Sequence, residues 1–157
     1  FADRASHASL SHWHWEAYES TDQSMTKLML NGLTNKPVEE LISLAKSWSS
    51  PAEIELRDDR HQAAYKPDEK AYTISLANEL SNLDFTLKGS DNSPIVNPAF
   101  VIENWGNSDI ILEVDGKVKE KGKDVRYDIC HSVDSDDLII WMRLEKNKEV
   151  QFSISKK

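Results

Sequence analysis

The sequence predicts a mainly β fold, an antiparallel β-sandwich or jelly roll of about eight strands preceded by two short helices. From Glu53 onward, apolar and polar residues alternate in short runs, as they do in strands with one buried and one solvated face. Turn residues separate these runs at intervals of roughly 8 to 12 residues, which is the spacing typical of a sandwich. No segment of helical length lies between the runs, so nothing favours parallel pairing through crossover helices.

Length and charge narrow the class of protein. The chain has 157 residues, a length typical of one domain, and we expect a single soluble domain over 1–157. Its formal net charge of −8 argues against nucleic acid as a partner, because phosphate binding needs an excess of Lys and Arg. No apolar run reaches the roughly 20 residues of a membrane helix, so no membrane partner is expected. Since the chain begins with Phe1 rather than Met, we expect that the natural start has been removed.

Cys130 is the only cysteine, which excludes an internal disulfide. Its neighbours Ile129 and His131 suggest a strand. We predict a buried and unreactive thiol in the core, and a reactive or metal-binding thiol is the alternative.

The first fifty residues are interpreted as an irregular segment followed by two helices. Asp22 can cap a short helix that ends at Asn31-Gly32, a pair typical of a left-handed C-terminal cap. Asn35 is the candidate N-cap of the second helix. An apolar stripe over 38–48 forms one face of this helix, and Ser49-Ser50-Pro51 ends it. Because no linker-like stretch follows, we expect both helices to pack on the sheet.

The alternating runs define the strands of the second part. The run 95–102 is more continuously apolar despite Asn97 and Pro98, which predicts a strand covered on both faces. Asp115-Gly116 separates two runs and is typical of a type I′ hairpin turn. The predicted strands cover 53–57, 72–76, 83–88, 95–102, 110–114, 117–119, 125–133, 138–144 and 150–154.

The run His12-Trp13-His14-Trp15 provides the most specific candidates for a metal site. In an extended chain His12 and His14 lie on one face, where two imidazoles can bind one transition metal with His7 as a third ligand. A complete site would need a further ligand from elsewhere, such as His61 or His131. The alternative is that the histidines are surface residues while the tryptophans anchor the segment to the core.

Aromatic residues near the start could also bind a sugar. Trp13, Trp15 and Tyr18 could form a platform on which the C–H face of a sugar ring packs, because this removes apolar area from water. Trp105 is a further candidate for stacking. The alternative is that these aromatic side chains belong to the core.

The charged clusters suggest two kinds of ligand. Lys117, Lys119 and Lys123 lie at alternate spacing, with Lys121 and Arg126 beside them, and suit an anionic polysaccharide. The alternative is an edge strand that lysines protect against pairing with another chain.

Acidic residues gather at Asp134, Asp136 and Asp137, and at Asp58-Asp59, and loop carboxylates of this kind can bind Ca²⁺. The spacing of an EF-hand is absent, and solvated turns are the alternative. No cofactor is required by the sequence.

Complete catalytic motifs are absent from the sequence. It has no Gly-rich phosphate loop, no G-x-S-x-G, no H-E-x-x-H and no C-x-x-C. Carboxylates are plentiful, but no pair is singled out for glycoside hydrolysis. His14 and Tyr18 could act as base and acid on a polysaccharide.

Three segments of the later strands share a further feature, and they are 93–102 followed by Trp105, 112–117 with 121–124, and 137–142. These segments resemble C-terminal β-sandwich accessory domains of large secreted bacterial enzymes that degrade polysaccharides, including lyase-like enzymes. The likeness covers about residues 40 to 155. The resemblance implies a non-catalytic carbohydrate-binding or accessory module beside other domains of a larger parent chain, in a secreted or periplasmic setting. The basic cluster adds the expectation that the polysaccharide is anionic. Part of a polysaccharide lyase or hydrolase that uses the N-terminal histidines, and a purely structural packing domain, are the two alternatives.

Overall fold

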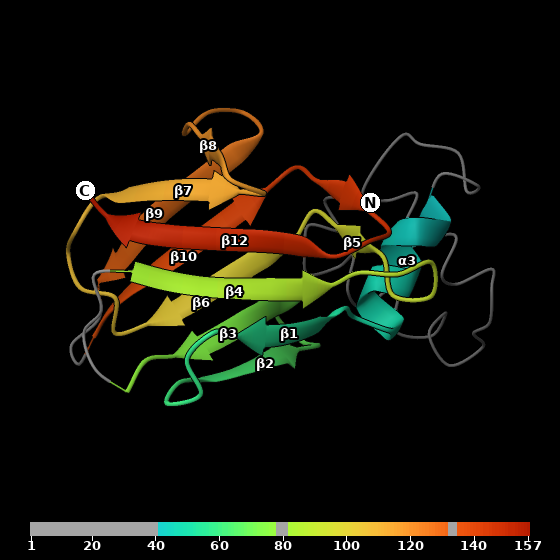
Figure 1. Cartoon of the computed structure of the whole chain (residues 1–157), viewed down its shortest axis with the longest axis horizontal. Helices are drawn as coiled ribbons and strands as arrows, with labels where there is room; N and C mark the ends of the chain where they lie inside the picture. Colours follow the sequence, from blue (N-terminus) through green and yellow to red (C-terminus); the bar gives the residue numbers. More distant parts are fainter. Residues whose placement is uncertain (1–40, 78–81, 132–134) are drawn as a thin grey trace, which may run out of the picture. The chain divides into compact units, whose positions relative to one another are not determined.

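The computed structural model describes residues 41–77, 82–131 and 135–157 (Figure 1). The chain divides into two units, Phe1–Ile42 and Ser43–Lys157. The first unit lies almost wholly outside the described residues, and so does the segment 22–30 that we predicted as the first helix. The fold described below is that of the second unit.

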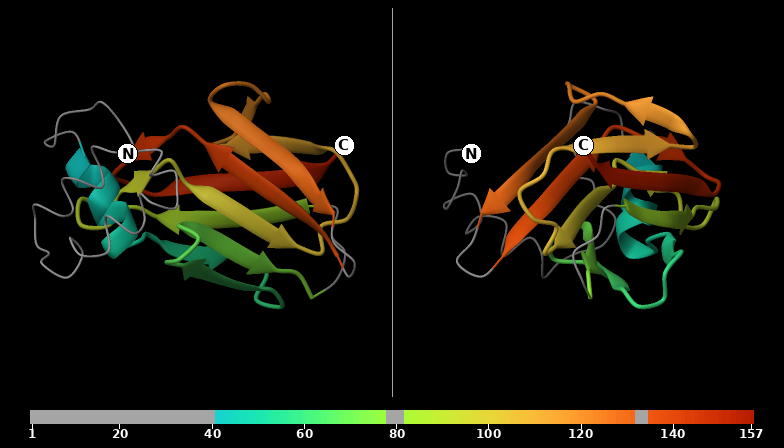
Figure 2. Two further views of the ribbon diagram at one scale, coloured as in Figure 1. Left: turned by 180° about the vertical axis from the view of Figure 1, so that it is seen from behind. Right: turned by 60° about the vertical axis from the view of Figure 1, so that its left-hand side comes forward.

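Two five-stranded sheets form this unit (Figures 1 and 2). Sheet A has the strand order β1 (Glu53–Leu56), β4 (Asn82–Lys88), β12 (Val150–Lys156), β7 (Ile110–Val114) and β8 (Lys117–Lys119). Sheet B has the order β2 (Gln62–Lys66), β3 (Ala71–Ser75), β6 (Ala99–Glu103), β10 (Asp136–Met142) and β9 (Val125–His131). A separate two-stranded ladder joins β5 (Ile95–Val96) to β11 (Glu145–Lys146).

The inner faces of the two sheets share one hydrophobic core. Phe100 of sheet B lies 5.0 Å from Phe85 and 5.2 Å from Phe152 of sheet A, measured between ring centroids. Both contacts have the edge-to-face geometry that aromatic quadrupoles prefer. In β4 and β12 the residues on the inner face are buried and alternate with exposed or partly exposed ones. The fold is therefore mainly β and sandwich-like, as the alternation predicted.

The number of strands and their pairing differ from the prediction. The described residues contain twelve strands and one helix, α3, where we predicted about eight strands and two helices. β3 and β6 pair in parallel, although we predicted antiparallel pairing throughout. Because β4 of sheet A lies between β3 and β6 in the sequence, the chain leaves sheet B and returns to it. No crossover helix within the sheet is needed for this parallel pair.

The predicted strand over 95–102 is broken in the middle. Asn97 has a φ of 46°, and its backbone N–H donates to the carbonyl of Leu144 at 2.7 Å. Pro98 has no N–H to give to a ladder. The chain therefore forms β5 and then β6, and β6 has one buried and one partly exposed face rather than two covered faces.

The hairpin between β7 and β8 confirms the turn prediction. Asp115 and Gly116 have φ values of 50° and 71°, which are the two positive angles that a type I′ turn requires. Val114 pairs with Lys117, so two residues connect the strands.

The helix α3 (Ile42–Ser49) ends where Ser49-Ser50-Pro51 predicted, and it contacts the sandwich. Trp48 lies 5.7 Å from the Lys70 ammonium, measured to the ring centroid. Lys46 donates to the carbonyl of Asp91 at 3.1 Å, and Ser50 and Ser93 share a hydroxyl hydrogen bond of 3.0 Å. These contacts connect the segment before β1 to the turns around β2, β3 and β5.

Candidate functional site

A groove with a volume of about 520 Å³ runs across the outer face of sheet A. Residues of β1, β4, β7 and β12 line it, and Gly116 of the β7–β8 hairpin lines one end. We call it the sheet A groove. Successive side chains of a strand point to opposite faces of the sheet. The polar residues of each alternating run therefore face this groove, and the apolar residues between them face the core.

Two rows of side chains cross the groove from strand to strand. In one row Glu113 lies opposite Ser153, and Ser153 lies opposite Asp84. In the next row Gln151 lies opposite Thr86, and Thr86 lies opposite Glu55. Neighbouring strands are about 4.8 Å apart, so each row presents a hydrogen-bonding group at that interval.

Most charges in the groove are paired. Arg57 donates to the Asp84 carboxylate at 3.1 Å, and Asn82 donates to the same oxygen at 3.1 Å. Lys88 lies 2.7 Å from a Glu55 oxygen and 3.2 Å from a Glu149 oxygen. Hydrogen bonds with these two carboxylates raise the pKa of Lys88.

Glu113 is different from the other acidic residues of the groove. Within the described ranges its carboxylate has neither an ion-pair partner nor a hydrogen-bond donor. The four carboxylates in and beside the groove outnumber the two cations that pair with them, so its net charge is negative. The carboxylates are Glu55, Asp84, Glu113 and Glu149, and the cations are Arg57 and Lys88.

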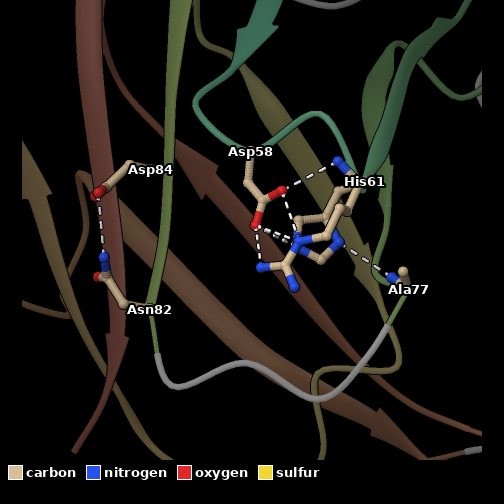
Figure 3. A network of polar contacts seen from close by, with 6 residues as sticks. Asp58, His61, Ala77, Asn82 and Asp84 are labelled. Carbon is tan, nitrogen blue, oxygen red and sulfur yellow. Dashed lines mark hydrogen bonds and ion pairs between the residues drawn. The ribbon is translucent and has the colours of Figure 1, made fainter.

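A network of polar contacts fixes the loop between β1 and β2, next to Arg57 (Figure 3). The Asp58 carboxylate accepts from the Arg60 backbone N–H at 3.0 Å and from its guanidinium Nε at 2.9 Å. These hydrogen bonds with Arg60 hold the pKa of Asp58 well below its usual range. His61 is buried, its Nδ1 accepts from the Ala77 N–H at 3.0 Å, and its Nε2 lies 3.6 Å from Asp58.

This environment makes His61 a structural residue, although we considered it as a metal ligand. Its Nδ1 is occupied by a backbone donor, and its ring is enclosed by the protein. In the part of the chain that the structure describes, no group of three or more His, Cys, Asp or Glu residues could hold a metal ion.

Three of the four candidate calcium ligands within the described residues have other partners, and Asp59 is the exception. Asp136 lies 2.6 Å from His131, Asp137 accepts from the Asn104 N–H at 3.0 Å, and Asp58 binds Arg60. Asp134 lies outside the described residues.

Several predicted site residues also lie outside the described residues. These are the proposed metal ligands His7, His12 and His14, and the proposed sugar platform Trp13, Trp15 and Tyr18.

Trp105 is fully buried, with 0% of its surface exposed, and belongs to the core. Its ring therefore offers no face on which a sugar can stack, and the alternative reading of Trp105 as a core residue is correct. Cys130 is exposed rather than buried, because it lies opposite Asp137 on the outer side of β9 while Ile129 faces inward.

The basic cluster lies outside the groove. Lys117 and Lys119 of β8 are exposed and lie opposite Val114 and Leu112, whose side chains are buried in the core. Val118, opposite Glu113, is the β8 residue on the groove side. Lys123 lies in the turn before β9 and is exposed.

The residues that line the groove were not predicted as a site. Glu55, Arg57, Asp84, Glu113 and Gln151 each occupy a polar position of an alternating run, and such positions are usually ordinary solvated surface. Only the strand order of sheet A shows that these positions from four separate strands meet on one face.

Comparisons with protein-family models, with curated proteins and with solved structures found no match for the chain. Among the described residues, no helix has the length and apolar character needed to span a membrane.

Proposed function

We propose that this chain is a non-catalytic glycan-binding accessory module and that the sheet A groove is its binding face. The observation that carries the proposal is the groove itself, whose hydrogen-bonding side chains come in two rows from four neighbouring strands. Sugars present hydroxyl groups at intervals of a few ångströms, and carboxylates, amides and hydroxyls are the partners that such groups need.

The affinity is expected to come from hydrogen bonds rather than from stacking. Phe85 and Phe152 lie beneath the groove and are buried in the core, so they supply a rigid floor and no exposed ring. Gln151, Thr86 and Ser153 are the groups best placed to meet hydroxyls, since they carry no charge that must be desolvated.

The charge of the groove favours a neutral glycan. Glu113 has no cationic partner within the described residues, and Lys88 is shared between two carboxylates. A uronate or sulfate in the groove would meet this surplus of negative charge. The expectation of an anionic polysaccharide, which rested on the lysine cluster, is therefore not supported by this face.

Binding is favoured over catalysis by the pairing of the carboxylates. Glycoside hydrolysis uses two carboxyl groups that are free to exchange protons or to attack. Asp84 and Glu55 are held in ion pairs with Arg57 and Lys88, which leaves Glu113 as the free carboxylate among the described groove residues.

The setting that we propose is a secreted or periplasmic polysaccharide-degrading enzyme with further domains. It rests on the resemblance of 93–102, 112–117 and 137–142 to accessory domains of such enzymes.

Calorimetric titration against neutral oligosaccharides of β-linked glucose, xylose and mannose tests the proposal. We expect at least one to bind, and we expect Gln151→Ala with Thr86→Ala to weaken that binding by at least tenfold. Gln62→Ala, an exposed glutamine of sheet B, is the matched control and should leave the affinity unchanged. The proposal is overturned if no neutral glycan binds or if the groove variant binds like the control.

A glycoside hydrolase is the second candidate, and one observation favours it. Glu113 and Asp84 flank Ser153 across the groove, which places their backbones about 10 Å apart at the spacing of neighbouring strands. Inverting enzymes hold their two carboxyl groups about 6.5–9.5 Å apart, a separation that side chains on backbones at this spacing can reach. Release of reducing sugar by the parent chain and its loss in Glu113→Gln would support hydrolysis, and no release at all would eliminate it.

A further inference from the structure

We propose that the outer face of sheet B holds a second glycan site, in which Trp141 and Arg126 bind a uronic acid unit. This site lies on sheet B, whereas the groove lies on sheet A. It takes an anionic sugar, whereas the groove favours a neutral glycan. It therefore stands independently of the proposed groove function.

The two side chains are neighbours on adjacent strands. Trp141 of β10 lies opposite Arg126 of β9 on one side and opposite Ala99 of β6 on the other. The residues before and after Trp141, Ile140 and Met142, are buried in the core, so the indole lies on the outer face. Trp141 is half-buried, and Arg126 is exposed.

Arg126 lies over the tryptophan ring. Its Cζ is 5.5 Å from the centroid of the Trp141 ring, within the range of a cation–π contact. Within the described ranges no hydrogen bond or ion pair engages the N–H groups of this guanidinium. A guanidinium held in this way is oriented in advance for a planar anion.

Arg126 differs from every other arginine that the structure describes. Arg57 is paired with Asp84, Arg60 with Asp58 and Arg143 with Asp124, at distances from 2.5 to 3.1 Å. The structure gives Arg126 no carboxylate partner within the described ranges. An acidic sugar would supply this missing carboxylate, and a guanidinium can bind a carboxylate with two parallel hydrogen bonds.

The surface beside the indole suits the C–H face of a sugar ring. Ala99 is too small to cover the side of Trp141 that it faces. Ile139, two residues before Trp141 on the same face, is 42% exposed and lies opposite Val101. A pyranose ring that packs on Trp141 would remove this apolar area from water while its carboxylate reaches Arg126.

Neighbouring charges determine where the carboxylate binds. Asp128 is the next outward residue of β9 and would repel an acid placed between itself and Arg126. The opposite side of Arg126 leads to Asp124, whose charge is offset by Arg143 at 3.0 Å. Beside it lies Lys123, an exposed lysine with no carboxylate partner among the described residues. We therefore place the carboxylate on the Lys123 side, and this is a role in charge pairing that the sequence had suggested for Lys123.

Titration of the full chain with an oligogalacturonate, followed by calorimetry and tryptophan fluorescence, tests this site. We expect binding that weakens as salt is added, because part of the attraction is between charges. Arg126→Gln should weaken the affinity roughly tenfold to a hundredfold, the usual effect of removing a charge-assisted hydrogen bond. Trp141→Phe should abolish the ligand-induced change in fluorescence.

Lys146→Gln is the matched control, because it removes one positive charge from β11, outside both sheets. It should bind oligogalacturonate like the parent chain. The inference fails if the parent chain does not bind, or if Arg126→Gln and Lys146→Gln bind equally well. Failure of neutral glycans to bind in the groove would leave this result unaffected, so the two proposals are tested separately.

Discussion

Gly89 lies so close to the backbone of Lys148 that a Cβ at residue 89 would be 2.5 Å from the Lys148 carbonyl oxygen. The same Cβ would be 2.8 Å from a terminal carbon of Ile95. This approach brings the end of β4 against the turn that leads into β12, and it is available only to a residue without a side chain.

We therefore predict that Gly89→Ala destabilises the sandwich by about 1–3 kcal/mol, the usual cost of inserting a methyl group into packed structure. The free energy of unfolding, measured by urea titration, checks this value. Gly122→Ala is the control, since a Cβ there would meet nothing within 4 Å. Equal stability of the two variants would contradict the close packing at Gly89.

Tyr72 should make the fold sensitive to alkali. Its hydroxyl donates to the Ala52 carbonyl at 2.8 Å, and burial raises the pKa of its phenol above the ordinary value of about 10. A raised pKa means that the folded state favours the protonated phenol. The corresponding stability is present below about pH 10 and is lost as the pH rises above it.

Tyr72→Phe should lower the stability at neutral pH by about 1 kcal/mol, because the hydrogen bond is lost. It should also reduce the fall in stability above about pH 10. Urea titrations across the alkaline range measure both effects. An alkaline profile that stays the same in the variant would show that other groups, such as the half-buried Tyr65, control it.

Asp58 should contribute to stability at the acid end. Hydrogen bonds from Arg60 lower the pKa of Asp58, so the folded state favours the carboxylate. Its contribution is present above the ordinary pKa of about 4 and is lost as the pH falls below that value. We predict that Asp58→Asn unfolds with a flatter dependence on pH below about 4 than the parent chain. Asp59→Asn is the control, and an unchanged acid profile in Asp58→Asn would argue against the prediction.

His61 should be required for folding rather than for metal binding. The buried ring accepts the Ala77 N–H through Nδ1, so His61→Ala leaves a partly buried donor without this partner. We expect a loss of about 2–4 kcal/mol, from this donor and from the cavity together.

His61→Asn should recover part of that stability, since an amide oxygen can replace Nδ1 as an acceptor. Thermal unfolding of both variants with and without added zinc checks the assignment. Zinc-dependent stability that His61→Ala abolishes would instead support a ligand role.

The alternation of residues was sufficient to predict most strands. Ile110, Leu112 and Val114 are buried as their spacing requires, and Asp115-Gly116 forms the expected turn. The sequence did not predict β2, because Gln62-Ala63-Ala64-Tyr65-Lys66 has little apolar character. This segment forms a strand through its pairing with β3 rather than through its own strand propensity.

Most residues of the candidate sites could not be predicted from the sequence. Trp105 lies just after β6 and Trp141 lies in β10, yet the first is fully buried and the second lies on an outer face beside Arg126. Trp105 lies beyond the end of β6 and is enclosed by the core, whereas the exposure of Trp141 depends on which face of β10 it occupies, the inner or the outer. A one-residue shift in register would exchange these faces, and register is set by the partner strand.

The sequence by itself determined that the chain is mainly β, acidic, and divided into short strands with one buried face, because these properties depend on local periodicity and composition. The tertiary structure alone decided that Glu113, Ser153 and Asp84 form one row, and that Arg126 meets Trp141 without a carboxylate partner in the described residues. Glu113, Ser153 and Asp84 come from strands far apart in the sequence, and Arg126 and Trp141 come from two consecutive strands. Their contact follows from the order of strands in the sheet, which many distributed core contacts establish together and no local motif records.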